Sequence, residues 1–404
     1  MNNKLPIIFA TALALTSCIY DFDAGEVFTD ERVVIEGDIS LGDVCEFSAR
    51  SVYPLNKKGS VKDLFPNVLF IVEDDQGGQY KAIQKEYAPA KIDLTSAPTD
   101  RKYRLYVEIR SGDYAKYASP WMEPLPAPVI GDLTETVNKT TTNTELVLGL
   151  DLSLENGSGC YRWDYEELYR FHSPLPGPEF EYKVVSGNPT LINHALVNDY
   201  SWWPYTYCWR QTNSLRTSVA IARALEGWKL EKHKILTIPL QSDELGTGEF
   251  YLKVKAKSIS ETQYKYLDAM NKGSDNVGSL LSPLPSDITG NIRNVDDATL
   301  YAIGYVAVNT VATKVFRVET KGIDKWHSPL RYYRSPYDMF PDLHTTAELY
   351  RAAYSYGFYP YKWEETTVQW VPINCIDCRK NNGTLEKPAG WEMEGEDEEE
   401  EEGL

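Results

Sequence analysis

The stretch "ELVLGLDLSLE", from Glu145 to Glu155, places a leucine at every second position. Because successive side chains of a β-strand point to opposite faces, this spacing sends the leucines from Leu146 to Leu154 to one face. The same period of two recurs in "LYVEI", Leu105 to Ile109, and in "LKVKA", Leu252 to Ala256. The pattern predicts strands with one buried and one more polar face.

A hairpin signal links two further apolar runs, "VLFIVED" and "QYKAI". Gly77-Gly78 lies between them, and glycine adopts positive φ angles without strain, as tight hairpin turns require. Strands joined by such turns favour antiparallel sandwiches. We therefore expect a mainly β fold, with an immunoglobulin-like or transthyretin-like sandwich first and a larger β-rich domain with short helical insertions after it.

Helix signals are few. In "SISETQYKYLDAMNKGS" a capping box of Ser260 and Gln263 precedes Tyr264, Leu267 and Met270, which share one helix face, so we expect a helix near residues 261–272. A second short helix is expected near residues 345–356. Four prolines between Ser119 and Asp132 indicate a domain junction. The predicted layout is a first sandwich over 31–127 and a larger domain over 128–391.

The N-terminus has the pattern of an exported lipoprotein. Lys4 precedes the apolar run from Leu5 to Leu15, which is too short to span a bilayer and is typical of a secretory signal peptide over residues 1–17. "LTSC", ending at Cys18, resembles the bacterial lipobox, in which the cysteine thiol receives a diacylglycerol. Cys18 is therefore the predicted lipidation site, and residues 18–30 form a lipid-anchored tether.

Acidic residues follow the anchor at once. Asp21, Asp23 and Glu26 resemble the signal that sends lipoproteins of the phylum Bacteroidota through the outer membrane to the cell surface. An ordinary polar tether on a periplasm-facing lipoprotein has a similar composition. We expect an outer-membrane, lipid-anchored protein that faces the cell exterior.

The charge balance limits the partners. The chain has 41 Lys and Arg against 59 Asp and Glu, a formal net charge of −18. Binding to nucleic acid phosphates requires basic patches, so nucleic acid is excluded as an expected partner. Residues 392–404 carry a run of like charges, which is typical of a disordered acidic tail. We expect no metal site there, because calcium binding needs carboxylates held in fixed geometry, and we expect no cofactor.

Cysteine usage fits an oxidising compartment. Besides Cys18 the chain has Cys45, Cys160 and the disulfide candidates Cys208, Cys375 and Cys378. Cys375 and Cys378 are so close in sequence that a bond between them would gain little loop-closure entropy. We therefore predict that one of the two pairs with Cys208, which would tie the C-terminal segment to the large domain.

Two aromatic clusters are candidates for a binding surface. "YSWWPYTYCWR" brings together Trp202, Trp203, Tyr205, Tyr207 and Trp209, and exposed aromatic rings beside an arginine can stack on sugar rings or bind a partner protein. The same rings could instead cover the edge of a sandwich. "YSYGFYPYKW", Tyr354 to Trp363, leaves the same two interpretations open.

Catalytic motifs are scarce. The sequence has no G-x-S-x-G, H-E-x-x-H, Walker or G-x-G-x-x-G pattern. Asp164, Glu166 and Glu167 could supply a glycosidase pair, but nearby carboxylates are common in an acidic chain. The sequence thus favours a protein that is not an enzyme, with a hydrolase as the weakest alternative.

Several longer segments carry a family resemblance. "VVIEGDIS" (33–40), "YRLYVEI" (103–109) and "YRWDYEE" (161–167) are followed by "YLKVKAKSISETQYKYLDAMN" (251–271), by "GSLLSPLPSDITGNIRNVDDATLYAIGYVAVN" (278–309) and by "CIDCRKNNGTLEKPAGW" (375–391). In order and spacing they resemble a Bacteroidota lipoprotein family catalogued as domain of unknown function 4249. The resemblance implies an N-terminal sandwich, a larger β-rich domain and frequent genetic association with TonB-dependent outer-membrane transporters. It implies no catalytic residues.

Two functional interpretations remain. In the first, a surface lipoprotein captures a peptide, glycan or metal chelate for a TonB-dependent barrel, or covers that barrel. In the second, the protein is a self-standing adhesin or structural protein that binds host or matrix polymers. The family resemblance favours the first.

The anchor is directly testable. The Cys18 thiol is the only predicted acceptor of the diacylglycerol, so Cys18→Ala should abolish labelling by a radioactive fatty acid and block processing of the signal peptide. Labelling of the variant at the wild-type level would contradict the lipobox assignment.

Overall fold

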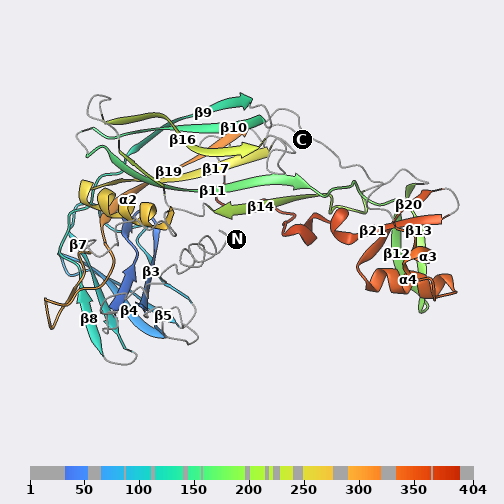
Figure 1. The fold of residues 1–404 in the computed structure, drawn as a ribbon, viewed down its shortest axis with the longest axis horizontal. Coiled ribbons are helices and arrows are strands. Elements are labelled where there is room, and N and C mark those ends of the chain that lie inside the picture. The colour runs from blue at the N-terminus through green and yellow to red at the C-terminus, as the bar shows by residue number, and fades with distance from the viewer. Residues whose placement is uncertain are drawn as a thin grey trace, which may run out of the picture.

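The computed structural model describes residues 32–52, 65–85, 88–110, 114–139, 144–155, 158–195, 201–213, 218–221, 228–239, 249–275, 290–319, 334–364 and 367–391. The predicted signal peptide, Cys18, the tether and the acidic tail lie outside these residues. The fold is mainly β, as the sequence predicts, and has three parts (Figure 1). A first sandwich adjoins a central sandwich. A two-stranded ribbon, formed by β11 (Cys160–His172) and β14 (Tyr207–Asn213), extends from the central sandwich to a small distal lobe at the other end of the long axis.

The first sandwich consists of two antiparallel sheets. One has the order β1-β3-β6, and the other has the order β18-β8-β7-β4-β5. Their strands are β1 (Arg32–Glu36), β3 (Val44–Val52), β4 (Asn67–Asp74), β5 (Gln79–Lys85), β6 (Ala90–Asp93), β7 (Tyr103–Ile109), β8 (Ala115–Ala118) and β18 (Arg293–Asn294). The alternation predicted for β7 is present, because Leu105, Val107 and Ile109 are buried while Arg104, Tyr106 and Glu108 are only partly so.

A distant segment completes this sandwich. Residues 290–308 contribute Ile292, Ala302, Val306 and Val308 to its core, and Ile303 forms a parallel bridge with Val34. The crossing is so close that a Cβ on Gly304, at φ +139°, would lie 1.9 Å from the carbonyl oxygen of Ile35. The sequence assigned this segment to the larger domain over 128–391, but it belongs to the first sandwich. Pairing between strands so far apart in the chain leaves no local pattern in the sequence, so the assignment was wrong.

The central sandwich packs a three-stranded sheet against a larger one. The orders are β16-β10-β9 and β14-β11-β17-β19-β2, and β15 also pairs with β11. The strands are β2 (Ile39–Leu41), β9 (Val129–Lys139), β10 (Thr144–Ser153), β11 (Cys160–His172), β14 (Tyr207–Asn213), β15 (Ser218–Ile221), β16 (Lys229–Pro239), β17 (Glu249–Ile259) and β19 (Val308–Glu319).

The leucine stripe forms one half of the central core. On β10, Leu146, Leu148, Leu150 and Leu152 are all buried, as the period of two predicts. They share this core with Leu252, Val254 and Ala256 of β17 on the facing sheet. The two sandwiches are joined through β2, which leaves the first sandwich and pairs in parallel with β19 from Ile39 to Leu41.

The distal lobe is formed by two hairpins and two helices. The hairpins are β12 (Phe180–Val185) with β13 (Asn188–Asn193) and β20 (Phe358–Glu364) with β21 (Thr367–Pro372), and the helices are α3 (Pro336–Met339) and α4 (Thr346–Ser355). Trp370 is fully buried among Phe180, Ala353 and Val368. The predicted layout did not separate this lobe from the central sandwich.

Both predicted longer helices are present. α2 covers Glu261–Asp275, and α4 begins with a capping box in which Thr345 and Glu348 bond to each other. At the start of α2 the hydroxyl of Ser260 accepts a hydrogen bond from Gln263 N (3.1 Å), as expected. The buried face differs from the predicted one: Gln263 is 1% exposed while Met270 is 45% exposed, because α2 packs with polar contacts against both sandwiches.

The turn between β4 and β5 depends on one buried carboxylate. Asp74 Oδ1 accepts hydrogen bonds from Gln76 N (2.9 Å) and Gly78 N (2.8 Å), and Oδ2 binds Arg101 Nη1 (2.8 Å). Burial acts to raise the pKa of Asp74, but these donors outweigh it and hold the pKa below its ordinary value of 3.8. The stabilisation is therefore present above that pH and is lost as the pH falls through the lowered pKa.

We expect Asp74→Asn to lower the free energy of unfolding at pH 7 by about 1–3 kcal/mol, because a neutral amide cannot replace the ion pair with Arg101. The difference from wild type should shrink as the pH falls below about 4, where the unfolded chain takes up the proton, and should be lost below the lowered pKa of the folded carboxylate. Urea titrations across pH 2–7 measure both effects. Asp75→Asn, on an exposed neighbour, is the control and should stay within about 0.5 kcal/mol. A pH-independent difference would contradict the assignment.

Candidate functional site

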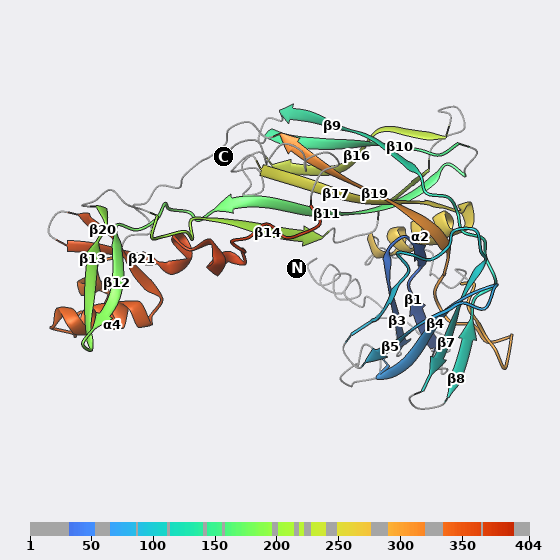
Figure 2. The ribbon, with the colours of Figure 1, turned by 180° about the vertical axis from the view of Figure 1, so that it is seen from behind.

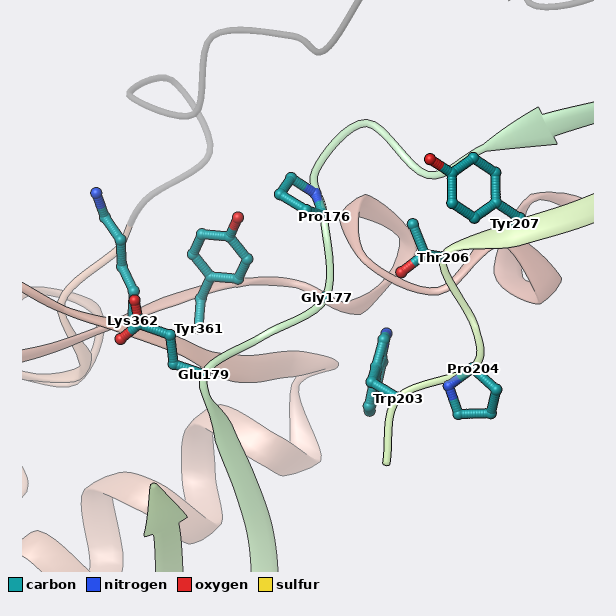
Figure 3. A pocket seen from close by; sticks show the side chains of 9 residues that line it. All are labelled: Pro176, Gly177, Glu179, Trp203, Pro204, Thr206, Tyr207, Tyr361 and Lys362. Carbon is teal, nitrogen blue, oxygen red and sulfur yellow. The ribbon is translucent and has the colours of Figure 1, made fainter. Parts of the chain in front are cut away.

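A pocket of about 490 Å³ lies at the neck, where the ribbon meets the distal lobe. We call it the neck pocket, and Figure 3 shows its lining. Three segments contribute: the connection from β11 to β12, the residues that lead into β14, and β20. The lining residues are Pro176, Gly177, Glu179, Trp203, Pro204, Thr206, Tyr207, Tyr361 and Lys362.

The β11–β12 connection, "SPLPGPE" from Ser173 to Glu179, has the residues that such a wall needs. Alternating prolines hold the chain extended and leave few backbone donors unpaired. Two of the remaining donors bond across the neck, from Leu175 N to Cys375 O (2.8 Å) and from Glu179 N to Tyr361 O (2.7 Å). Gly177 allows the chain to pass closely over Trp203, since a Cβ there would lie 3.2 Å from the indole Cδ1.

Trp203 forms the floor of the pocket and belongs to the lobe core. Its side chain is 8% exposed, and Nε1 donates a hydrogen bond to Ile376 O (2.9 Å). The ring packs against Tyr359, with ring centroids 4.9 Å apart, and edge-on against Tyr205 at 5.1 Å. Trp203 was a candidate for an exposed binding residue. The structure places it mostly inside, where its ring completes the lobe core beside Tyr359 and Tyr205.

The other four aromatic candidates separate into different environments. Trp202 stacks on His194, with centroids 4.5 Å apart, and Tyr205 lies under the Arg379 guanidinium at 3.4 Å. Both are partly buried and pack against the lobe core. Tyr207 lines the pocket, whereas Trp209 faces the C-terminal segment near Tyr251. The five aromatic residues are neighbours in the sequence but do not form one surface in the structure. Of the five, Trp203 and Tyr207 line the neck pocket.

The C-terminal segment returns along the ribbon and holds the neck. Two short 3₁₀ turns, η6 (Ile373–Cys375) and η7 (Cys378–Asn381), lead it back towards the central sandwich. Cys378 forms a disulfide with Cys208 of β14, 170 residues away in sequence. Cys375 is not part of this bond and is buried in the lobe core. Beyond the disulfide, Trp209 and Thr384 exchange backbone hydrogen bonds of 2.7 and 2.9 Å.

The polar groups of the pocket lie at its rim. Glu179 contributes a carboxylate whose Oε2 accepts a hydrogen bond from Trp363 N (3.2 Å), and Lys362 lies beside it in Figure 3. Tyr207, Tyr361 and Thr206 add hydroxyl groups. Behind them, burial raises the pKa of Tyr359 to about 12, so its hydroxyl stays protonated. Aromatic faces with hydroxyl and carboxylate groups around them suit a ligand that has both apolar faces and many hydroxyls, as a sugar ring has.

The acidic candidates for hydrolysis lie elsewhere. β11 sends Asp164 and Glu166 to one face and Glu167 to the other. Arg162 lies 3.9 Å from Asp164, and Lys255 lies 3.9 Å from Glu166. In the described part of the chain, no group of three or more His, Cys, Asp or Glu side chains is arranged to hold a metal ion. None of the helices described is long and apolar enough to cross a membrane.

Sequence reasoning missed most of the pocket. Pro176, Gly177 and Glu179 belong to no predicted motif, although the proline spacing of "SPLPGPE" is a signal of extended chain that could have pointed to this wall. The second aromatic cluster, Tyr354 to Trp363, for which the sequence leaves a binding surface and a sandwich edge both open, supplies Tyr361 and Lys362 to the pocket and Tyr359 to the core behind it. These residues meet because β20 packs against β12, with a backbone hydrogen bond from Glu179 N to Tyr361 O.

The burial of Trp203 leads to a stability prediction. Trp203→Ala should lower the free energy of unfolding of the lobe by about 3–5 kcal/mol, because it removes a large packed ring and leaves Ile376 O without its donor. Pulse proteolysis in a urea series measures this. Trp363→Ala is the matched control, since that ring is 56% exposed, and it should change the value by about 0.5 kcal/mol or less. Equal midpoints for Trp203→Ala and wild type would show that Trp203 is not core.

Comparisons with known proteins place the chain. No curated protein is similar enough to count as a match. Among solved structures, a segment of two fibronectin type III domains from chicken tenascin is 12% identical, with 57% of this chain and 92% of that chain covered and a TM-score of 0.18. A putative carbohydrate binding protein from Bacteroides uniformis is 10% identical, with 57% and 90% covered and a TM-score of 0.11. TM-scores this low do not establish a shared fold. Residues 19–315, in contrast, match the family described as domain of unknown function (DUF4249), and since this match spans well over half of the chain, the protein belongs to that family.

Proposed function

We propose that the protein is a binding protein of the outer-membrane surface that captures a ligand in the neck pocket for a TonB-dependent transporter. The lipobox at Cys18 and the acidic residues Asp21 and Asp23 support a location at the outer-membrane surface. The genetic association implied by the family resemblance supports the transporter. The observation that carries ligand capture is the neck pocket itself, in which Trp203, Tyr207 and Tyr361 surround a hollow with a carboxylate at its rim.

The chemistry of this lining favours a carbohydrate. A sugar ring presents C–H groups that pack on aromatic faces and hydroxyls that bond to carboxylate and hydroxyl groups. A volume of about 490 Å³ lies within the usual range for small-ligand sites, roughly 300–1,000 Å³. Peptides and metal chelates are the other ligand classes that a surface lipoprotein of this kind could capture. Measuring the retention of labelled glycans beside that of peptides and metal chelates distinguishes the three classes.

The position of the pocket also suits capture. The predicted anchor precedes the first sandwich, and the neck lies towards the opposite end of the long axis (Figure 2). A protein held at Cys18 would thus present the neck pocket away from its tether. The ribbon that carries it is stiffened by the returning segment and by the Cys208–Cys378 disulfide, which favours a preformed site over one that orders on binding.

The adhesin alternative has one observation in its favour. The distal lobe exposes a set of large apolar side chains, between 46% and 75% accessible: Val184, Val185, Tyr354, Tyr356 and Trp363. Such a surface suits contact with another macromolecule. The same surface would serve a transporter contact equally well, so the two functions differ in partner and not in the surface used.

The test combines capture with co-purification. Cells that display the wild-type protein should retain labelled glycans from a panel, and Tyr207→Ala with Glu179→Gln should reduce retention by about tenfold or more, because the ring and the rim charge are lost. Tyr114→Ala, an exposed ring of the first sandwich, is the matched control and should have no effect. Solubilised in mild detergent, the wild-type protein should bring a TonB-dependent barrel with it.

Three outcomes would contradict this proposal. Retention that is unchanged by the double variant would remove the neck pocket as the site. Retention of peptides or metal chelates in place of glycans would reassign the ligand class. If the protein purifies without a barrel, and its deletion leaves nutrient uptake unchanged while attachment to a polymer is lost, the adhesin function replaces ligand capture.

A further inference from the structure

A second cavity, of about 580 Å³, lies at the junction of the two sandwiches. We call it the junction cavity. In Figure 1, α2 lies between the central sandwich and the strands of the first sandwich, and this helix forms one wall. The segment that joins β1 to β3 forms another wall, and β11 and β17 supply Arg162 and Lys257.

One side of the junction cavity is apolar and aromatic. Tyr266, Leu267 and Met270 of α2 lie there with Ile35 and Tyr305. The rings of Tyr266 and Tyr305 pack together, with centroids 5.6 Å apart. Burial, with Glu36 and Asp38 nearby, raises the pKa of Tyr266, so its hydroxyl remains a neutral group. This side would accept an apolar or aromatic body of modest size.

The acids of the lining are already paired with cations. Asp38 bonds to Arg162, and it also accepts hydrogen bonds from Ala307 N (3.0 Å) and Gln263 Nε2 (3.2 Å). The other pairs are Glu36 with Arg50 at 2.6 Å, Glu46 with Lys91 at 2.6 Å, Asp43 with Lys255 at 3.0 Å and Asp164 with Arg162 at 3.9 Å. These ion pairs neutralise the carboxylates of the lining, so little negative charge is left to compensate the remaining cation, Lys257.

Lys257 is the exception among the charged groups of the lining. Its Nζ donates to Ser40 Oγ (2.7 Å), and no carboxylate of the described residues lies within 4.0 Å of it. Burial and the neighbouring Arg162 guanidinium lower the pKa of Lys257, and the carboxylates of Asp38 and Asp164, which are themselves paired with Arg162, only partly offset this. An ammonium group in a partly enclosed site, with one neutral partner, is stabilised by any anion that enters beside it.

Gln263 supplies a second unsatisfied group. Its side chain is 1% exposed, and its Oε1 has no hydrogen-bond partner among the described residues. The amide orientation is set by Asp38, because the Nε2 group must face the carboxylate that accepts its hydrogen bond. A buried carbonyl oxygen without a donor costs free energy, so this position favours a ligand that brings an N–H or O–H group.

We propose that the junction cavity binds a small carboxylate that carries an adjacent hydrogen-bond donor and an apolar side chain, the chemistry of an α-amino or α-hydroxy acid. The carboxylate bonds to Lys257 and Ser40, the donor bonds to Gln263 Oε1, and the side chain packs on Tyr266 and Tyr305. The site is separate from the neck pocket and lies at the other end of the ribbon, so it can fail while the proposed carbohydrate capture stands.

Calorimetry on the full chain in mild detergent tests this chemistry with four probes. They are phenylalanine, 3-phenyllactate, 3-phenylpropanoate and phenylalaninamide, followed by the corresponding leucine set. Phenylalanine and phenyllactate should bind. Loss of the donor in phenylpropanoate, or of the carboxylate in phenylalaninamide, should weaken binding by about tenfold or more. Absence of binding for every probe overturns the proposal.

Two variants locate the site. Lys257→Met should abolish binding, whereas Lys265→Met, which removes an exposed cation of α2, should leave it unchanged. Gln263→Met should equalise phenylalanine and phenylpropanoate, because the acceptor for the α donor is gone, and this variant carries the test if Lys257→Met does not fold. Binding by wild type that survives both substitutions would overturn the junction cavity as the site.

Discussion

The backbone pairing of β11 is the constraint on which the rest of the structure depends. Its first ten residues, Cys160 to Tyr169, pair with β17 inside the central sandwich, and its last seven, Glu166 to His172, pair with β14 on the other edge. The strand therefore extends past its sandwich while it is still hydrogen-bonded on one side. A two-stranded ribbon is marginal by itself, so the distal lobe can exist there only if other elements support the ribbon.

That support comes from the C-terminal segment. It crosses the neck as η6 and η7, bonds covalently to β14 through Cys378, and ends with Trp391 packed against Leu168 and Tyr251. A lobe built from an insertion between β11 and β14 and from a segment that follows β19 is thus closed by a return of the chain. The neck pocket lies where the β11–β12 connection, the residues leading into β14 and strand β20 come together, so its lining comes from three separate segments.

The two sandwiches meet through polar contacts more than through a shared apolar core. Asp38 accepts hydrogen bonds from Arg162 of β11, from Gln263 of α2 and from Ala307 N ahead of β19. Buried ionic contacts fix geometry at the cost of desolvation, and they leave room that close apolar packing would fill. The junction cavity lies at this polar contact, whereas the neck pocket lies where the ribbon meets the lobe.

The sequence by itself determined what depends on neighbours along the chain. The leucine period set the buried face of β10, Gly77-Gly78 set the first hairpin, and Thr345 with Glu348 set the start of α4, because strand faces, turns and caps are decided within a few residues. Only the tertiary structure decided that Trp203 is core, that Cys378 and not Cys375 bonds to Cys208, and that Gln263 meets Asp38 across 225 positions. Such contacts arise when distant segments pack together, and neither periodicity nor propensity carries information about that packing.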